Sequence, residues 1–420
     1  MSSDSAHPQP GLLRRNPGFR SLFAATFASG LGTWIAVVAL TIDVYDRTGS
    51  AKWVSALLVA DFLPSVAIGL LFGPLIDRLS RRRIMVVSDL ARLGIFVALP
   101  FTDSAQAIVI LAAAAGFATG FFRPASYAGL PNLVSAADLA DANSRLRAGE
   151  YLSWTLGTAL GGVIVAASGP DLAYWINSAT FLVSGIFILQ IAPSLLQAKA
   201  AESRGHWRDV GDGFAVVFHT RVLLAVFCAW NLVMLGNAGI NVAEVVLAKV
   251  DFASGNVSSD VAFGLLWAAS GLGLLLGSLY APRWLEVRGI LLVYTGSLSL
   301  MGFGALTTAI APSVWVALPC MVLGGAGNGA AVVYNSLLVQ RGAPDELRGR
   351  AFTVIMSTNF ALLGLGMIAA GLLTDALGAR WVFAISAACA GIGALVGFVL
   401  LRSARAGAAD HDSQPVSVTG

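Results

Sequence analysis

Twelve long apolar segments occupy most of this chain of 420 residues. Each segment is near or above the ~20 residues that an α-helix needs to cross a bilayer. Residues of the types AVILMFWYC make up 57% of the chain and DEKR only 12%, about half the share of charge in a soluble domain. We therefore predict an all-α membrane protein with twelve transmembrane helices, at about 20–44, 53–76, 84–102, 106–131, 148–167, 172–192, 220–247, 260–281, 289–310, 313–340, 351–374 and 379–401.

Basic residues predict how these helices are oriented, because Lys and Arg concentrate in cytoplasmic loops. If the N-terminus is cytoplasmic, 20 of the 26 basic residues lie in cytoplasmic segments, four lie in outer loops, and Arg92 and Arg123 lie within spans. The first 18 residues contain no apolar run of the kind found in a cleaved signal, so we expect a cytoplasmic tail. Twelve spans then place both termini in the cytoplasm. The excess of arginine over lysine favours a GC-rich bacterial genome, and hence the bacterial cytoplasmic (inner) membrane.

The chain also contains an internal duplication with an offset of 209 residues. Each copy holds six spans, an even number, so both copies enter the membrane from the same side and are related by a pseudo-twofold axis along the membrane normal. We expect six-helix bundles at 1–192 and 220–402, a cytoplasmic linker at 193–219 and a disordered tail at 403–420. The offset superimposes Gly116 on Gly325, Gly120 on Gly329, Gly162 on Gly371, Gly169 on Gly378 and Ile176 on Ile385.

A charged segment, residues 73–83, separates the second span from the third. It contains Asp77 among four arginines, at the point where a helix ends. A carboxylate there can accept hydrogen bonds from the free amides at the N-terminus of a neighbouring helix and interact with the positive helix dipole. Gly73 permits the close helix contact that this requires. Alternatively, these charges only anchor the loop at the lipid headgroups.

The same segment resembles the signature loop G-x-L-x-D-R-x-G-R-R-R of the major facilitator superfamily, with Ser80 in place of the second glycine. Residues 156–162, 176–181 and 343–350 resemble segments of the third drug:proton antiporter group, which includes macrolide efflux proteins and the enterobactin exporter. Leu160 stands where the antiporter motif has proline, and Thr33 where many relatives carry an acidic residue. The resemblance implies two rigid halves that alternate their access to the two sides of the membrane.

The resemblance also implies that Asp77 contacts the start of the eleventh helix, across the interface between the halves, and latches the outward-facing state. A carboxylate among arginines adds nothing to a headgroup anchor, so we favour this latch over the anchor. The predicted conformational latch comprises Gly73, Asp77, Arg78, Arg81, Arg82, Arg83 and Asp89.

Asp61 and Arg123 are charged residues deep within predicted spans. Asp61 lies eight residues, or ~12 Å, from the outer end of the second helix, and Arg123 lies as far from the cytoplasmic end of the fourth helix. In a bilayer core about 30 Å thick their depths differ by about 6 Å, so a bridge between the second and fourth helices is possible. A carboxylate at this depth faces water, is paired or is protonated, and Asp61 is thus a candidate for substrate or proton handling or for a structural ion pair. Arg123 either faces a cavity or snorkels to the headgroups. Asp43, Glu244 and Asp375 lie near outer helix ends, where we expect solvated rims.

Polar uncharged residues cluster on the predicted seventh and tenth helices. In the family that the chain resembles, helices 1, 4, 7 and 10 line a central cavity, which makes these residues candidate substrate contacts. Alternatively, buried asparagines hold helices together by hydrogen bonds worth about 0.6–2 kcal/mol. The candidates are Trp34, Asn237, Asn241, Asn328, Tyr334 and Asn335.

Three classes of function remain: an exporter, a facilitator or importer, and an intramembrane enzyme. We predict a secondary exporter of an amphipathic small molecule or drug by proton antiport, because the chain has no ATPase motif. The alternative is a facilitator or importer of a specific metabolite. An enzyme is disfavoured because all four histidines lie outside the predicted bilayer. We expect a monomer without cofactor or metal that meets small molecules, protons and membrane lipids; the net charge of +3, without a basic run, disfavours nucleic acid.

Overall fold

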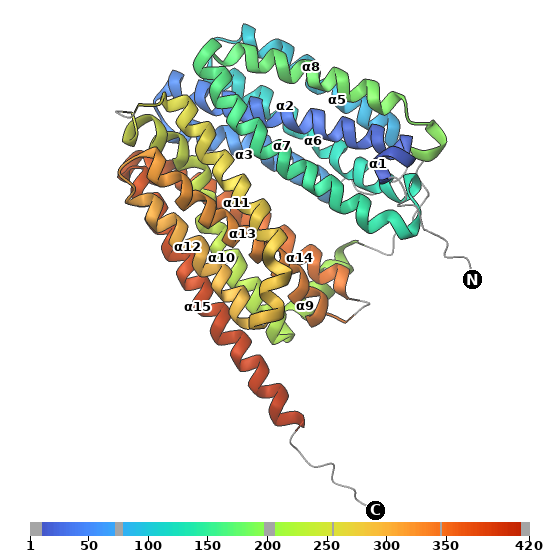
Figure 1. The fold of residues 1–420 in the computed structure, drawn as a ribbon, viewed down its shortest axis with the longest axis vertical. Helices are drawn as coiled ribbons and strands as arrows, with labels where there is room; N and C mark the ends of the chain where they lie inside the picture. The colour runs from blue at the N-terminus through green and yellow to red at the C-terminus, as the bar shows by residue number, and fades with distance from the viewer. Residues whose placement is uncertain (1–10, 72–78, 197–205, 254–255, 345–346, 413–420) are drawn as a thin grey trace, which may run out of the picture.

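The computed structural model describes residues 11–71, 79–196, 206–253, 256–344 and 347–412. Within these residues, twelve helices are long and apolar enough to cross a bilayer. They form two bundles of six, which confirms the predicted fold class (Figure 1). The N-terminal bundle comprises α2 (Pro17–Thr48), α3 (Ala51–Leu71), α5 (Arg81–Ala98), α6 (Ala105–Leu133), α7 (Leu139–Ser168) and α8 (Pro170–Leu189), with the short helices α1 (Leu12–Arg15), η1 (Leu99–Phe101) and η2 (Ala136–Asp138). The C-terminal bundle comprises α10 (Arg221–Val246), its π-helical continuation η4 (Leu247–Asp251), α11 (Ser259–Arg288), α12 (Ile290–Ala309), α13 (Val314–Gly342), α14 (Arg348–Leu377) and α15 (Ala379–Asp412).

Local sequence accounts for where these helices begin and end. The Asn16 side chain caps α2 by accepting a hydrogen bond from the Phe19 amide at 2.9 Å, and Pro17 occupies the first helical position, where its missing N–H costs nothing. Gly169 and Gly378 end α7 and α14 with φ of 76° and 88°, values that glycine adopts without strain. These two glycines correspond under the offset of 209 residues, so both bundles turn in the same way before their last helix.

The duplication is visible in the packing of the helices. Gly116 on α6 lies against the backbone carbonyl of Asp61 on α3, so closely that a Cβ atom would overlap it. Gly325 on α13 meets the carbonyl of Ser270 on α11 in the same way, and both members of this pair are shifted by 209 residues. Close backbone approach at small residues is the usual way in which helices associate in a bilayer. The pairs α3–α6 and α11–α13 are therefore equivalent.

The two bundles meet at a pair of equivalent crossings, α7 on α11 and α3 on α14. A Cβ atom on Gly162 would lie 3.0 Å from the Cα atom of Gly264, and one on Gly371 would lie 2.7 Å from the Cβ atom of Ser55. The offset of 209 residues carries Gly162 onto Gly371 and Ser55 onto Gly264. The interface between the halves thus has the predicted pseudo-twofold symmetry.

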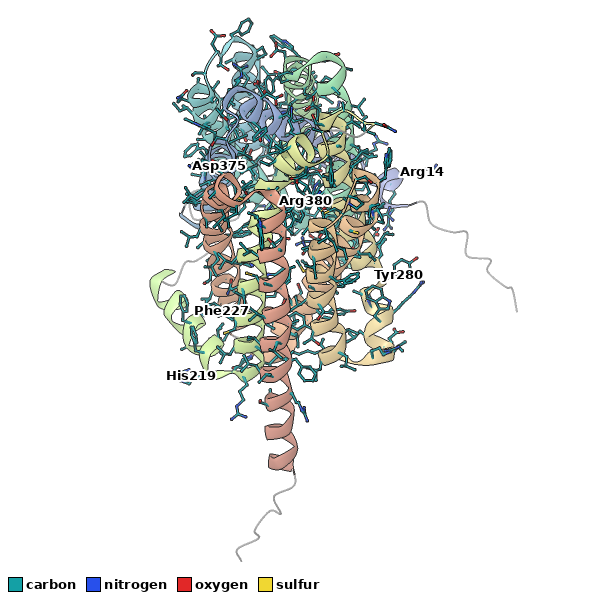
Figure 2. All side chains as sticks on the ribbon, turned by 90° about the vertical axis from the view of Figure 1, so that its left-hand side faces the viewer. Arg14, His219, Phe227, Tyr280, Asp375 and Arg380 are labelled. Carbon is teal, nitrogen blue, oxygen red and sulfur yellow. The ribbon has the colours of Figure 1, made fainter. Side chains whose placement is uncertain are left out.

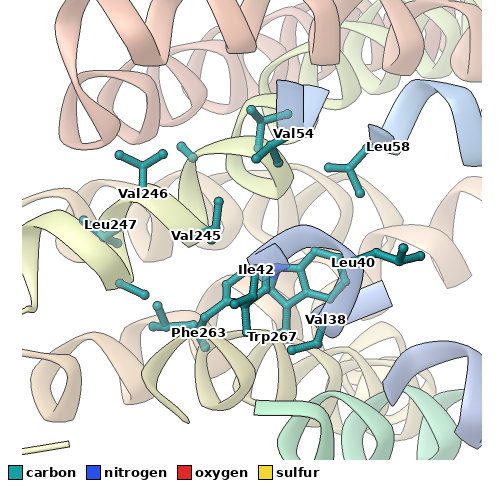
Figure 3. Packing of buried hydrophobic residues seen from close by; sticks show 14 of the residues in the cluster. Val38, Leu40, Ile42, Val54, Leu58, Val245, Val246, Leu247, Phe263 and Trp267 are labelled. Atoms are coloured by element: carbon teal, nitrogen blue, oxygen red, sulfur yellow. The ribbon is translucent and has the colours of Figure 1, made fainter. Parts of the chain in front are cut away.

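Buried apolar residues form three clusters, and their distribution defines the shape of the molecule. One cluster draws on both bundles and includes Val38 and Val54 from the first and Val245 and Phe263 from the second (Figure 3). The other two clusters are separate, one within residues 217–401 and one within residues 12–196. Among the described residues, the halves therefore share a core at one end and have separate cores at the other.

This shared core lies at the helix ends remote from the chain termini. We call it the closed end and the opposite end the open end. The ribbons converge at the closed end and diverge toward α1 and α9 (His206–His219) at the open end (Figure 1). In the side view, Asp375 and Arg380 mark the closed end of the C-terminal bundle, and His219 lies at its other end (Figure 2).

The linker and the tail contain more helix than we predicted. The linker at 193–219 contains η3 (Pro193–Leu196) and α9, which packs on α10 and α14. Val217 of α9 is buried, and the Phe218 ring lies 5.4 Å from that of Phe227. The segment 403–420, which we expected to be disordered, is helical as far as Asp412, because α15 continues beyond the bundle. Residues 413–420 lie outside the described part of the chain.

The glycine contacts predict which positions tolerate an added methyl group. Gly329→Ala would place a Cβ atom against the carbonyl of Leu274 and force α11 and α13 apart, which we expect to cost about 1–3 kcal/mol and to lower Tm in detergent by about 1–6 °C. Gly391→Ala is the matched control, since its Cβ atom meets nothing within 4 Å. An unchanged Tm for Gly329→Ala, measured by tryptophan fluorescence, would contradict the close packing.

Candidate functional site

A cavity of about 700 Å³ opens within the C-terminal bundle. Its wall is formed by α10, α11, α12, α13 and α15, and Trp154 of α7 contributes from the other half. This volume includes space that is open to solvent, and the wall combines apolar side chains with a few polar groups, as small-molecule sites do. The cavity is therefore a candidate site for a small molecule.

Three of the predicted polar residues lie together on this wall. Asn237 and Asn241 come from α10, and Asn328 comes from α13. Asn237, Asn241 and Glu244 are spaced by four and three residues, so they share one face of α10. The wall thus combines amide groups with one carboxylate.

Glu244 was not among the site residues that we predicted from the sequence. We expected a solvated rim, but its side chain is only 2% exposed, and it lines the cavity. The reason is that the helix does not end near Val246: it continues as η4 to Asp251, which places Glu244 about 10 Å inside the span. The spacing shared with Asn237 and Asn241 was the signal that could have revealed it.

No cation neutralises Glu244 within the described residues. Trp267 is the polar side chain that interacts with its carboxylate, and this contact falls short of full hydrogen-bond geometry. Lys249, the nearest basic residue along α10 and η4, is bound to Asp46 and Asp260 instead. An unpaired carboxylate inside a span is costly, which marks Glu244 as a functional candidate.

Tryptophan side chains form the boundary between the cavity and the other half. Trp34 of α2 stacks on Trp154 with ring centroids 5.0 Å apart and an interplanar angle of 11°. Trp34 also meets Trp267 of α11 edge to face at 6.0 Å. Trp154 and Trp267 line the cavity, whereas Trp34 lies behind them. Trp34 therefore supports the wall and is separated from the cavity by these two rings.

The remaining two predicted cavity residues lie elsewhere. Tyr334 is fully buried and donates a hydrogen bond to the carbonyl of Ala281 at 2.8 Å, which ties α13 to α11. Asn335 is buried too, and neither polar atom of its amide finds a partner in the described part of the chain. Neither residue belongs to the cavity wall.

A second cluster of buried polar groups lies in the N-terminal bundle. Arg92 donates to Asp89 at 2.5 Å, and the Ser184 hydroxyl donates to the same carboxylate at 2.8 Å. The Arg92 guanidinium also lies between the rings of Phe122 and Phe181, 4.6 and 4.3 Å from their centroids. Asp89, predicted as part of the latch, is 1% exposed and engaged inside its own bundle.

Asp61 belongs electrostatically to this cluster. The charged group that acts on its carboxylate is Arg92. Arg92 forms its ion pair with Asp89, and it acts on Asp61 through its charge without an ion pair between them.

The bridge that we considered between Asp61 and Arg123 is not formed. Arg123 pairs instead with Glu150 of α7 at 3.4 Å, and Tyr127 donates to the same carboxylate at 2.8 Å. The Arg123 side chain is 67% exposed, because it extends toward α7 and away from α3. Similar depth in the bilayer did not bring the two residues together, since they point in different directions around their helices.

The predicted latch is described only in part. Gly73, Asp77 and Arg78 lie outside the described residues. Arg82 donates to the carbonyl of Leu189 at the end of α8, Arg81 is buried, and Arg83 is exposed. The latch therefore stays a prediction.

At the closed end, Asp375 joins the halves by capping a helix. We expected a solvated rim, but its carboxylate accepts hydrogen bonds from the Ala51 amide at 2.6 Å and the Ser50 hydroxyl at 2.7 Å. These groups form the N-terminus of α3, whose positive dipole favours the carboxylate. Lys52 lies 3.8 Å away. Asp77, at the end of the second span, was predicted to contact the start of the eleventh helix. Asp375 makes the reverse contact at the opposite end: it lies at the end of the eleventh span, α14, and caps the start of the second, α3.

Further polar contacts strengthen the closed end. Lys249 binds Asp46 of α2 at 2.5 Å and Asp260 of α11 at 2.7 Å, and thereby links the halves. Asp43, another expected rim residue, is buried and accepts from Arg47 at 2.6 Å and from Tyr174 at 2.9 Å. The charges of these five residues are thus mutually neutralised.

Known proteins resemble the chain over nearly its whole length. The multidrug efflux pump Tap of Mycolicibacterium fortuitum is 30% identical over 393 residues, which cover 88% of this chain and 92% of that protein. Macrolide efflux protein A of Streptococcus pyogenes is 22% identical, with 88% and 92% covered. Among solved structures, the nucleoside transporter NupG superposes with a TM-score of 0.73 at 17% identity and covers 91% of this chain and 99% of its own.

The family is defined by a match to almost the entire sequence. Residues 13–417 match the family described as transmembrane secretion effector. A bacterial homologue of the iron transporter ferroportin shares the fold, with a TM-score of 0.72 at 14% identity. The chain belongs to the transmembrane secretion effector family of the major facilitator superfamily.

Proposed function

We propose that the chain is a secondary transporter that exports amphipathic small molecules, including drugs, by alternating access and proton antiport. The observation that carries the proposal is the asymmetry of the interface: the halves share a core at one end and have separate cores at the other. Two rigid bundles held at one end can rock about the cavity. Relatives named multidrug and macrolide efflux proteins support a drug as the substrate.

The proposed orientation places both termini in the cytoplasm of a bacterium, with the chain in the inner membrane. The distribution of basic residues supports this assignment. The closed end then faces the outside, and the structure corresponds to the inward-facing form. The predicted latch around Asp77 stabilises the outward-facing form, in which the open end has closed.

Proton coupling is supported by the charge balance of the buried cluster. Arg92 is ion-paired with Asp89, and Asp61 has no ion pair among the described residues, which leaves one negative charge inside the span unless a proton is bound. Such a charge is costly in a bilayer, so one of the two carboxyl groups takes up and releases a proton during the cycle. Because Asp89 has two donors, we assign this role to Asp61.

Transport in inverted vesicles tests the export. Inverted vesicles from a pump-deficient strain that expresses the chain should accumulate a radiolabelled macrolide or tetracycline when their lumen is acidic, and a protonophore should abolish the accumulation. Vesicles without the chain are the control. Accumulation of a metabolite by right-side-out vesicles, with none of any tested drug by inverted ones, would instead support a facilitator or importer.

Asp61→Asn tests the proton role. We expect it to abolish accumulation driven by the pH gradient and to leave exchange of substrate across the membrane measurable, because exchange needs no net proton movement. Asp141→Asn is the matched control, since Asp141 is exposed and pairs with Arg145 on the surface.

A double variant separates proton transfer from a structural ion pair. Removing both charges in Asp61→Asn/Arg92→Gln should not restore accumulation if Asp61 carries the proton. Full accumulation in the double variant would show that Asp61 serves only to balance Arg92.

Asp375→Ala tests the closure of the closed end. The loss of a helix cap costs about 0.5–2 kcal/mol, so the outward-closed population should fall about 2- to 30-fold relative to the outward-open one. Spin labels at Phe101→Cys and Trp315→Cys, exposed positions at this end, would report a longer distance in a background without native cysteines. Asp171→Ala, in the first turn of α8 at the same end, should leave the distance unchanged. The same distance distribution in Asp375→Ala would contradict this role.

A further inference from the structure

The cavity in the C-terminal bundle has a chemistry that indicates which molecules it accepts. It contains one carboxylate, three amides and two indole rings, and the remainder of its wall is mainly apolar. We propose that the cavity binds lipophilic organic cations and that Glu244 is their counter-ion. This inference rests on the proposed export function and specifies the substrate class of the same protein.

Glu244 needs a positive partner that the described part of the chain does not provide. The basic residues at the closed end, where Glu244 lies, are engaged with other acids: Lys249 with Asp46 and Asp260, Arg380 with Asp251, and Lys52 with Asp375. Arg47 of α2 is bound to Asp43. The carboxylate is buried and its only polar contact among the described residues is with Trp267. A bound cation would supply the missing charge.

The walls suit the body of such a cation. The faces of Trp154 and Trp267 attract positive charge through their ring quadrupoles, and indole is the most effective side chain for this interaction. The amide oxygens of Asn237, Asn241 and Asn328 can accept hydrogen bonds from an ammonium group. Apolar side chains such as Leu274 and Met301 complete the surface for an alkyl or aromatic part.

Without a bound cation, the charge of Glu244 is balanced in another way. An unpaired carboxylate in a span is neutralised by a proton when no cation is present. Entry of a permanent cation then forms the ion pair and releases the carboxyl proton to the medium. The acids of the neighbouring elements, Asp46, Asp260, Asp251 and Asp375, have basic partners of their own, so we expect the released proton to come from Glu244.

Binding to the purified full chain in detergent tests the proposal without transport. The probe is tetraphenylphosphonium, a permanent cation with no proton of its own, and triphenylphosphine oxide is the neutral comparison. We expect tetraphenylphosphonium to quench tryptophan fluorescence and to release about one proton per chain in weakly buffered solution. Glu244→Gln should weaken its binding about 10- to 100-fold, abolish the proton release and leave the neutral compound unaffected. Glu286→Gln, on the exposed end of α11, is the matched control.

A second variant keeps the test decisive if Glu244→Gln does not fold. Trp154→Leu removes one aromatic face and should weaken tetraphenylphosphonium binding while proton release per bound cation persists. Equal affinity for the cation and the neutral compound, or proton release that survives in Glu244→Gln, would overturn the proposal. If the chain fails these binding tests but still exports a drug, the proposed export function holds and only the proposed cation site is ruled out.

Discussion

Glycines that approach the backbone of neighbouring helices hold this molecule together. In a bilayer, apolar side chains gain little by leaving lipid, so helices associate where small residues allow tight packing. Gly162 against Gly264 and Gly371 against Ser55 bring the halves together at two equivalent crossings. The shared core and the ion pairs of Lys249 distinguish the closed end from the open end, and they lie at the same end as these crossings.

The polar groups divide into those that hold the structure and those that remain unsatisfied. Asp375 caps α3 across the interface, and Asp43 is surrounded by Arg47 and Tyr174. Glu244 and Asp61, by contrast, have no cation of their own, since Lys249 is engaged and Arg92 is already bound to Asp89. Among the described residues, each half thus has a carboxyl group within its spans that lacks an ion pair. Their separation is compatible with distinct roles for substrate and proton.

Much of the fold could be predicted because its signals are local or repetitive. The twelve spans follow from apolar length, and the equivalence of the halves follows from the offset of 209 residues, which the contacts of Gly116 and Gly325 reproduce. The grouping of Asn237, Asn241 and Asn328 on one cavity was anticipated from the family resemblance. These features need little knowledge of how one helix is rotated against another.

The remaining features depend on tertiary geometry that the sequence does not reveal. The apolar run ends before the helix does, because α10 continues through η4 to Asp251. Glu244 was therefore predicted to lie at a solvated rim. The cap formed by Asp375 joins residues more than three hundred positions apart. Arg123 lies at a depth similar to that of Asp61 but points to Glu150, because depth gives no information about direction around the helix axis.

In alternating access, the two ends of the molecule open and close in opposition. This motion is tested most directly by the distance between spin labels at the open end, at Ser144→Cys on α7 and Arg288→Cys on α11. The distance is measured in proteoliposomes, with and without an acidic outer side and a transported drug. We expect this distance to shorten under the conditions in which the distance at the closed end lengthens. Distances that stay fixed at both ends during transport, or that change in the same sense, would contradict it.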